Sequence, residues 1–427
     1  MNLLLTALLT TVGTGEAPTF SKDVAPILFA NCVTCHRPGA IGPFNLTTYA
    51  EARKRSKLIA RVATDKTMPP WKPEDGHGEF LDTRTLTVAQ IATLKMWAEA
   101  GAPEGDPKQT PKLPVFKTGW QIGKPDIILK MPKAFTAPAE GRDIYMHFVF
   151  PLDIKSDIYV KAVEVRPGNL KVAHHAIGLL DSSGTARKKA DPKTGGYVGF
   201  GGPGFVPSGF TPGFVPGATP RAFEPGSAIT LKKGTDFVLQ MHYHPTGKAE
   251  VDQTEVGLYL TKEKPTKHML GVLMGSLEID IKPGDANYVC TDKFVLPVAL
   301  KVGSIWAHMH LIGKDVKVWA ELPEGKTVKL LRIGDWDFNW QDTYLYKEPV
   351  TLPRGTVIKT EWRFDNTNAN PRNPNNPPKR VLNGEGSTDE MGGVWIGGEV
   401  ATEGDMWSLL LANVGHYIEV ESKKKAK

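Results

Sequence analysis

The sequence predicts an α-helical N-terminal domain followed by two all-β sandwich domains. Apolar residues recur at helical spacing before residue 104, and short alternating runs bounded by Gly, Pro and Asn dominate after residue 118. A linker rich in Pro and Lys separates the two patterns. The 43 glycines and 34 prolines among 427 residues also favour short strands and many turns.

We expect six segments along the chain. They are a signal peptide (1–17), the helical domain (18–104), the linker (105–118), two β-sandwich domains (119–263 and 264–421) and a basic tail (422–427). The polar run 262–267 indicates the break between the sandwiches. Four lysines in the tail supply much of the formal net charge of +6, and no basic stripe with interleaved aromatic residues suggests nucleic acid.

The N-terminus has the features of an export signal. The apolar run after Met1 is about ten residues long, whereas a bilayer span needs roughly 20. Gly15 and Ala17 are small residues that suit cleavage after Ala17. A short N-terminal strand is the alternative interpretation. No other segment is apolar enough to span a membrane, so we expect a periplasmic or secreted protein.

Two helices are expected in the N-terminal domain. Ser21 is the predicted N-cap of the first helix, which includes the apolar residues 27–29 and ends at the cysteine pair. The second helix extends from Thr87 to Ala100, where apolar residues recur at helical spacing and Gly101 is a stop signal. The two helices flank the motif on which the assignment of this domain depends.

That motif is Cys32-Val-Thr-Cys35-His36, the attachment sequence of c-type haem. Two thiols add across the two vinyl groups of one porphyrin, and the following His36 then lies under the iron as an axial ligand. A Cys-x-x-Cys pair alone would also suit a redox pair or half a zinc site. The added His, the export signal and the flanking helices favour haem, so we predict an all-α cytochrome c domain.

The sixth haem ligand is expected further along the chain. Met68 is the strongest candidate, because a Met between polar residues and a Pro-Pro corner joins no apolar helix face. His77 is the second candidate, and Met96 is assigned to packing on the second helix. Met/His ligation would raise the reduction potential, which suits an electron carrier. Cys290 has no obvious partner, so we do not expect disulfides to hold the fold.

Histidines of the β region fall into three clusters, which are His174 with His175, His242 with His244, and His308 with His310. Residues two apart on a strand share a face, so His308 and His310 form a bidentate metal clip. Adjacent residues point to opposite faces, so His174 and His175 share one metal only where the strand ends or bulges. Three such clusters favour a metal site over incidental histidines.

The β region resembles the copper type II, ascorbate-dependent monooxygenases, the family of the peptidylglycine-hydroxylating and dopamine β-monooxygenases. Four motifs in the family's order carry the resemblance: His174-His175, Gln240-x-His242-Tyr243, His308-x-His310 followed by Leu-x-Gly-Lys, and Asp389-Glu390-Met391. The matching region runs from near Lys124 to the end. The Cys-x-x-Cys-His domain ending in Met-Pro-Pro-Trp is similar to the N-terminal part of a bacterial subgroup of that family.

The resemblance implies two copper ions bound by two jelly-roll-like sandwiches that face each other across a cleft. The ligand sets would be His174, His175 and His242 for one copper, and His308, His310 and Met391 for the other. Spacing alone leaves His244 open as an alternative to His242. Imidazole suits both oxidation states of copper and a thioether favours Cu(I), so the Met site would bind oxygen and the other site would relay electrons.

Two positions depart from the family pattern. Trp306 and Trp395 occupy the positions where the peptidylglycine enzymes use an Arg and a Tyr to hold the peptide carboxylate. Peptide amidation is therefore not implied. These two residues and Gln240 become candidates for contacts with a metal ligand or with substrate. The family's disulfides cannot form, because only Cys290 remains outside the haem motif.

The expected function is copper-dependent hydroxylation of a C–H bond. Substrate, O2, two electrons and two protons would give alcohol and water, with the electrons relayed from one covalently attached haem c. The expected partners are a small-molecule substrate and a periplasmic electron donor, either a cytochrome or an ascorbate-like reductant. Two alternatives remain: a copper-binding or electron-transfer protein without hydroxylase activity, and a sugar- or protein-binding sandwich with incidental histidines.

Overall fold

The computed structural model describes residues 16–199, 202–217, 219–384 and 386–425. The chain divides into two compact units, one formed by residues 1–71 and 84–115 and the other by residues 72–83 and 116–427. The predicted signal peptide lies outside the described residues except for its last two positions, and so does the end of the basic tail.

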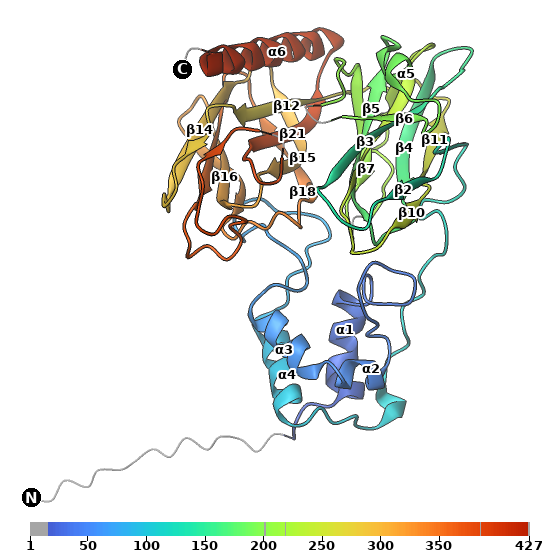
Figure 1. The fold of residues 1–427 in the computed structure, drawn as a ribbon, viewed down its shortest axis with the longest axis vertical. Coiled ribbons are helices and arrows are strands. Elements are labelled where there is room, and N and C mark those ends of the chain that lie inside the picture. Colours follow the sequence, from blue (N-terminus) through green and yellow to red (C-terminus); the bar gives the residue numbers. More distant parts are fainter. Residues whose placement is uncertain (1–15, 200–201, 218, 385, 426–427) are drawn as a thin grey trace, which may run out of the picture. The chain divides into compact units, whose positions relative to one another are not determined.

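The first unit contains short helices joined by long irregular segments (Figure 1). These elements are a π-helical turn (Phe20–Val24), α1 (Ala25–Asn31), α2 (Tyr49–Arg53), α3 (Ser56–Thr64), α4 (Val88–Glu99) and a 3-10 turn (Pro107–Gln109). The second helix was expected from Thr87 to Ala100, and α4 confirms it; Thr87 is its N-cap and forms a capping box with Gln90. The predicted N-cap of the first helix is wrong, because the π-helical turn starts after Thr19 and buries Ser21.

The predicted fold class, an all-α cytochrome c domain followed by two all-β sandwich domains, is wrong. The described residues form a mainly β protein with 21 strands and six α-helices. Helices cover fewer than half of the described residues of the first unit, so it is not an all-α domain. The longest helix, α6 (Glu403–Lys425), lies where an all-β domain was expected. Apolar residues recur at helical spacing in α6, and the interpretation of this region as strands overlooked that recurrence.

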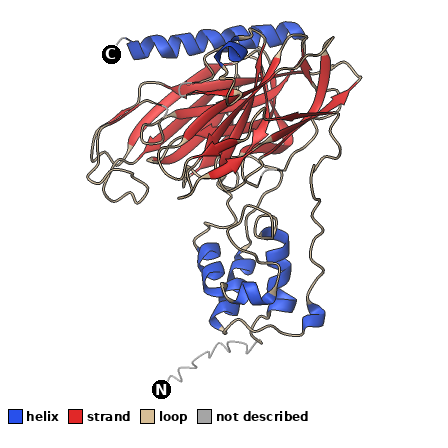
Figure 2. Ribbon diagram, turned by 45° about the vertical axis from the view of Figure 1, so that its right-hand side comes forward, coloured by secondary structure: helices blue, strands red, loops and turns tan. Residues whose placement is uncertain are grey.

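All the strands found in the described residues, drawn in red in Figure 2, belong to the second unit. The N-terminal β half has two main sheets. The five-stranded sheet has the order β6 (Gly196–Val198), β3 (Ile144–Phe150), β9 (Asp236–Tyr243), β5 (Ala173–Asp181) and β7 (Gly209–Phe214). The four-stranded sheet has the order β1 (Ile127–Lys130), β11 (Glu255–Thr261), β4 (Ile158–Arg166) and β8 (Ile229–Leu231). Smaller elements of this half are the pair β2 (Phe135–Ala137) with β10 (Glu250–Asp252) and the helix α5 (Thr185–Lys189).

One hydrophobic core joins the two main sheets of this half. Its fully buried residues include Phe148, Phe237 and Leu239 from the five-stranded sheet and Val256 and Leu258 from the four-stranded one. Burial of each such side chain contributes on the order of 1.5–3 kcal/mol. The core fixes the face of β9 and β5 that packs inward, and so fixes the register of the histidines on these strands.

The C-terminal β half begins after residues 262–267, where the sequence predicts a break. One sheet has the order β12 (His268–Ser276), β21 (Gly392–Val400), β15 (Leu300–His308) and β18 (Thr343–Leu352). The second has the order β14 (Tyr288–Val295), β19 (Val357–Phe364), β16 (Gly313–Glu321) and β17 (Thr327–Ile333). A small pair, β13 (Asp280–Ile281) with β20 (Val381–Leu382), completes this half, and α6 packs along β12 (Figure 1).

Residues 72–83, which we call the anchor segment, belong to the second unit although the sequence places them in the N-terminal domain. The backbone N–H of Glu74 donates to Arg332 O and that of Leu81 donates to Leu345 O, both at 2.8 Å. Phe80 is buried against the rings of Tyr344 and Tyr346. These contacts need partners more than 200 positions away, so local sequence patterns cannot predict them.

Among the described residues, no helix combines the length and the apolar character that a membrane crossing requires.

Candidate metal centres

The first candidate centre lies where β5 pairs with β9. Their register places Ala173 opposite Tyr243 and His175 opposite His242, so His174 is an extra residue at the start of β5. Such a bulge allows two adjacent side chains to turn to the same side of the sheet. The structure therefore brings together His174 and His175, whose directions the sequence left open.

The imidazoles of His174, His175 and His242 converge at this bulge, each through its own Nδ1 atom. The Nδ1 atom of His175 lies 3.1 Å from Nδ1 of His174 and 3.3 Å from Nδ1 of His242. Three nitrogens that share one metal at about 2.0 Å in a roughly tetrahedral arrangement lie about 3.3 Å apart. The three ligand atoms all fall within 4.8 Å of one another, so the set has the dimensions of a metal site.

Burial keeps the imidazoles of His174 and His175 neutral and thus able to bind a metal. Burial, with the nearby charge of His242, lowers the pKa of His174 to about 4. The same two causes hold the pKa of His175 well below its ordinary value. Neutral imidazole is the metal-binding form, so protons do not compete for these nitrogens near neutral pH.

Asp143 orients one of the three rings. Its Oδ2 lies 2.8 Å from Nε2 of His242, and its Oδ1 lies 2.8 Å from Nδ1 of His244. A carboxylate on Nε2 fixes the proton there and leaves the Nδ1 lone pair directed at the cluster. His244, with two thirds of its side chain exposed, is thereby held on Asp143. Burial alone would raise the pKa of Asp143, but the hydrogen bonds and charge of the two histidines lower it.

The second candidate centre lies at the end of β15. Nε2 of His308 and Nε2 of His310 are 3.1 Å apart. Nδ1 of His308 lies 2.5 Å from Oε1 of Gln341, and Nδ1 of His310 lies 3.1 Å from the carbonyl oxygen of Asp389. Both Nδ1 atoms therefore carry the proton, and both Nε2 lone pairs are available to one metal. Burial is the main cause that lowers the pKa of His308 to about 3 and that of His310 to about 4.

Glu390 holds Met391 beside His310. Its carboxylate is fully buried, and one oxygen, Oε2, accepts the backbone N–H of His310 at 2.8 Å and that of Met391 at 3.2 Å. The other oxygen accepts the backbone N–H of Ile312 at 2.8 Å. Burial raises the pKa of Glu390 to about 8, although these hydrogen bonds oppose the shift. One carboxylate thus ties the Met-bearing segment to the His-x-His turn.

Residues 334–342, the loop between β17 and β18, reach both candidate centres. The ring of Phe338 stacks on His174 at 5.9 Å between centroids and meets His310 edge-on at 5.8 Å. Gln341, which contacts His308, also donates from Nε2 to the backbone oxygen of Phe338 at 2.8 Å. One buried aromatic side chain therefore touches a predicted ligand of each centre.

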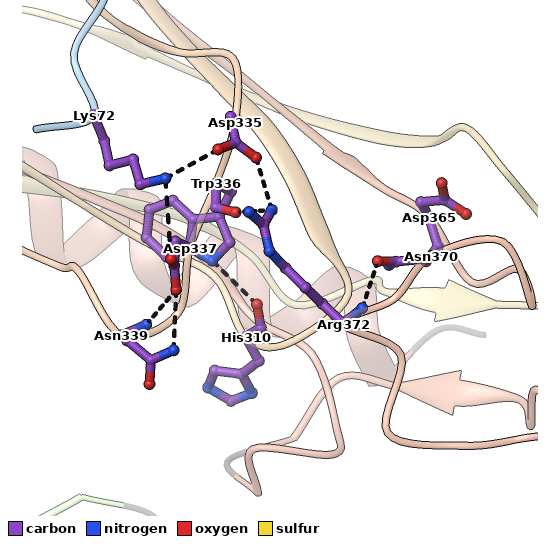
Figure 3. Close-up of polar contacts among 9 residues, drawn as sticks. All are labelled: Lys72, His310, Asp335, Trp336, Asp337, Asn339, Asp365, Asn370 and Arg372. Carbon is purple, nitrogen blue, oxygen red and sulfur yellow. Dashed lines mark hydrogen bonds and ion pairs between the residues drawn. The ribbon is translucent and has the colours of Figure 1, made fainter. Parts of the chain in front are cut away.

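Two cations from distant segments hold this loop, as Figure 3 shows. Nζ of Lys72, in the anchor segment, lies 3.0 Å from a carboxylate oxygen of Asp335 and 3.9 Å from one of Asp337. Arg372 pairs with Asp335 at 2.8 Å and donates to the backbone oxygen of Trp336. The indole N–H of Trp336 in turn donates to the carbonyl oxygen of His310 at 3.1 Å. The network fixes the backbone that carries a predicted copper ligand.

Of the other predicted contact residues, Trp306 contacts a predicted ligand, whereas Trp395 and Gln240 contact other residues. The ring of Trp306 stacks on His308 at 5.3 Å, and Trp306 pairs across strands with Trp395. Trp395 packs against Phe210 at 5.3 Å between ring centroids. Nε2 of Gln240 lies 3.0 Å from Nε2 of the buried His147, so Gln240 contacts a further histidine of this region.

The haem motif lies at the end of α1. The backbone N–H groups of Cys35 and His36 donate to the carbonyl oxygen of Cys32 at 3.2 and 2.9 Å, which forms a tight turn. Both thiols are free and partly buried. Nδ1 of His36 lies 3.1 Å from the carbonyl oxygen of Phe44, and the two rings stack. This contact places the proton on Nδ1 and leaves Nε2 as the ligand atom.

The candidates for a sixth haem ligand differ in their position. Met68 follows α3 in the first unit, where its backbone N–H donates to Val62 O at 3.1 Å. His77 lies in the anchor segment and so belongs to the second unit. Met96 is half exposed, so it does not serve the packing role assigned to it. Cys290 on β14 is a free thiol whose pKa burial raises to about 12.

Sequence reasoning missed Asp143, Gln341 and Phe338 and gave no role to Glu390. Asp143 and Gln341 are single polar residues without a recurring motif. The stretch Asp335-Trp-Asp-Phe-Asn-Trp-Gln341 could have indicated a functional loop. Three aromatic residues alternate there with polar ones, and the stretch is too short to form two paired strands.

Comparisons with known proteins do not identify a family. No protein-family model matches the sequence, and the comparison with curated proteins finds no match. Among solved structures, the major capsid protein P2 of bacteriophage PM2 is similar at 10% identity and a TM-score of 0.28, covering 65% of this chain and 98% of the capsid protein. The PBSX exported protein XepA is similar at 7% identity and a TM-score of 0.18, covering 56% and 86% of the two chains. TM-scores this low carry no argument about fold or function.

Proposed function

We propose that this chain is an exported copper-dependent monooxygenase that hydroxylates a C–H bond and receives electrons through a covalently bound haem. The observation that carries the proposal is the convergence of three Nδ1 atoms, from His174, His175 and His242, in one buried cluster. The second imidazole pair, with Met391 held beside it by Glu390, supports a second site of different ligand type.

The donor atoms fit copper. Imidazole is a good ligand for divalent copper, which binds nitrogen sites more tightly than the other divalent first-row metals, and a thioether adds preference for Cu(I). When bound, copper supplies one-electron redox chemistry and the activation of O2. We assign His174, His175 and His242 to one ion, and His308, His310 and Met391 to the other.

The chain's own residues orient these donors. Asp143 fixes the tautomer of His242, while Gln341 and the carbonyl oxygen of Asp389 fix those of His308 and His310. Ligands whose second nitrogen is hydrogen-bonded keep their orientation when the metal changes oxidation state, and loss of such partners typically lowers metal affinity or activity about 10–100-fold. Trp306 packs its ring on that of His308 and so limits the rotation of this imidazole.

The residues of the first unit fit a covalent haem. Cys32 and Cys35 are free thiols within one turn, and His36 has its Nδ1 engaged by a backbone oxygen. Haem, when attached, supplies a one-electron carrier. Met68 is the proposed sixth ligand. We propose that the electrons come from a periplasmic cytochrome or an ascorbate-like reductant and continue to the three-His site.

Product analysis with isotopic oxygen tests the proposed activity. The protein, loaded with copper and haem, is incubated with a periplasmic metabolite extract, a reductant and 18O2. We expect one metabolite to gain a single 18O atom, detected by mass spectrometry, because a monooxygenase places one oxygen atom in the product and the other in water. Metal-free protein is the control. Full reductant oxidation by loaded protein with no labelled product in any extract would favour an electron-transfer protein instead.

Electron supply through the haem gives a second prediction. Cys32→Ala with Cys35→Ala should remove the covalent haem and leave both copper sites intact, because these cysteines lie in a separate compact unit. We expect reduction of the copper sites by a periplasmic cytochrome to slow by on the order of tenfold or more, since a tethered carrier acts at millimolar-range effective concentration. Stopped-flow spectroscopy of copper reduction is the measurement. Equal rates in the variant and the native protein would show that the haem is not the relay.

A further inference from the structure

The turn that precedes the bulge of β5 is organised by Asn169. Residues 167–172 join β4 to β5, and the bulge follows directly at His174. The carbonyl oxygen of Asn169 accepts the backbone N–H of Ala173 at 3.2 Å, and its Oδ1 accepts that of Lys171 at 3.0 Å. An Asn side chain that bonds the backbone two positions ahead stabilises such a turn. Asn169 therefore sets the direction in which the chain enters the bulge.

A buried carboxylate holds this turn in place. Oδ1 of Asp252, the last residue of β10, accepts the backbone N–H of Asn169 at 2.9 Å. The side-chain amide of Asn169 donates to Oε2 of Glu250 at 2.8 Å. The backbones also touch, because a Cβ on Gly168 would lie 2.8 Å from the carbonyl oxygen of Gln253, so only glycine fits there. The turn is thus fixed against the end of β10.

The same carboxylate also reaches the strand that carries the third imidazole. Oδ2 of Asp252 accepts the hydroxyl of Tyr243 at 2.7 Å and that of Thr254 at 2.7 Å. Tyr243 is buried and directly follows His242 on β9. One carboxylate therefore connects the residue after His242 to the turn before His174.

We propose that Asp252 is the positioning residue of the three-His site. The inference rests on the proposed function, in which this site binds copper. The spacing of the three Nδ1 atoms depends on how the start of β5 lies against the end of β9, and Asp252 holds both. Its side chain is only 1% exposed, so water does not compete for its hydrogen bonds. Glu390 does the equivalent in the second centre, where one carboxylate holds the backbones of His310 and Met391.

Copper binding by the full-length protein tests this role. Metal-free protein is titrated with Cu(II) against a competing chelator, and the nitrogen splitting of the EPR signal identifies the site with three imidazoles. Asp252→Ala should lower the copper affinity of the three-His site about 10–100-fold, the range for loss of a group that orients a metal ligand. The other copper should bind as in the native protein, because its ligands are held by Glu390 and Gln341.

A conservative variant should rescue the site. Asp252→Asn keeps one oxygen for the backbone of Asn169, and its amide can donate to the hydroxyls of Tyr243 and Thr254 once these rotate. We expect most of the copper affinity and the native EPR signal to return. A role of Asp252 that depends on its charge alone predicts no such recovery, so an Asn variant as weak as Asp252→Ala would contradict the positioning by hydrogen bonds.

Glu164→Ala is the matched control. Glu164 is a buried carboxylate of β4 that accepts the hydroxyl of Tyr259 at 3.0 Å, and it belongs to the four-stranded sheet, whereas the three imidazoles lie on the five-stranded one. Thermal unfolding of the metal-free proteins measures the stability that each variant loses. We expect comparable losses of stability in Glu164→Ala and Asp252→Ala, but native copper affinity in Glu164→Ala. An equal loss of affinity in both would reduce the effect to general destabilisation and overturn the proposal.

A milder pair of variants covers the case in which Asp252→Ala does not fold. Tyr243→Phe removes one hydroxyl from Asp252 and should weaken copper binding at the three-His site about fivefold, the scale of one hydrogen bond. Tyr259→Phe removes the corresponding hydroxyl from Glu164 and should have no such effect. Native copper affinity in Tyr243→Phe would refute the role of Asp252 and leave the copper assignment standing. A native chain without the three-nitrogen signal would instead overturn the proposed function, and this inference with it.

Discussion

Met391→Ala should abolish hydroxylation while the three-His copper remains bound. The backbone of Met391 shares the Glu390 oxygen that holds the backbone of His310, so its side chain starts beside the His308–His310 pair. The thioether is the soft ligand of that set, and its loss lowers the affinity for Cu(I). We expect turnover to fall by on the order of a hundredfold or more, the scale on which removal of one directly acting group lowers kcat.

Three measurements check this result. Metal analysis should find two coppers per chain in the native protein, whereas Met391→Ala should keep the three-His copper and bind the second one weakly. Labelled product from 18O2 should disappear in the variant. Reduction of the remaining copper should proceed normally. Met269→Ala, which removes an exposed Met from β12 in the same half, is the matched control. Full activity in Met391→Ala, or a single copper in the native protein, would contradict the ligand assignment.

Phe338→Leu should slow electron exchange between the two candidate centres. The Phe338 ring stacks on His174 and meets His310 edge-on, so it is the packed contact between a ligand of one centre and a ligand of the other. Leucine keeps most of the volume and the apolar character but lacks the ring, so the cost in folding stability should stay below about 1.5 kcal/mol. We expect exchange to slow about tenfold, which corresponds to about 1.4 kcal/mol of barrier.

Rapid mixing of fully reduced protein with O2 and substrate measures this exchange, followed by the spectra of the three-His copper and of the haem. Phe135→Leu, a ring in the N-terminal core that packs on Phe148 and Tyr243, is the matched control for the same substitution elsewhere. Metal content should be unchanged in both variants. An exchange rate in Phe338→Leu equal to that of the native protein would show that electrons take another route.

The parts of the fold and of the site that the sequence predicts depend on contacts between residues that are close in sequence. The helix α4 and the shared side of His308 and His310 depend on contacts within four positions, and the structure shows both. The prediction of the fold class was wrong where helix and strand patterns compete in the sequence. Segment 403–425 has the recurrence of a helix, but the strands that precede it dominated the interpretation.

What the sequence by itself determined is the set of donor groups: a Cys-x-x-Cys-His turn, imidazoles in pairs and a Met in an acidic motif. Only the tertiary structure decided which of them meet. A one-residue bulge turns His174 and His175 to the same side, and the choice between His242 and His244 follows from Asp143, which precedes them by 99 and 101 positions. The placement of Phe338 depends likewise on Lys72 and Arg372, which hold its loop from distant segments. These long-range contacts form only after burial of the hydrophobic cores has fixed the registers of the strands. The hydrophobic effect is non-directional, so the sequence alone does not say which distant groups it brings together.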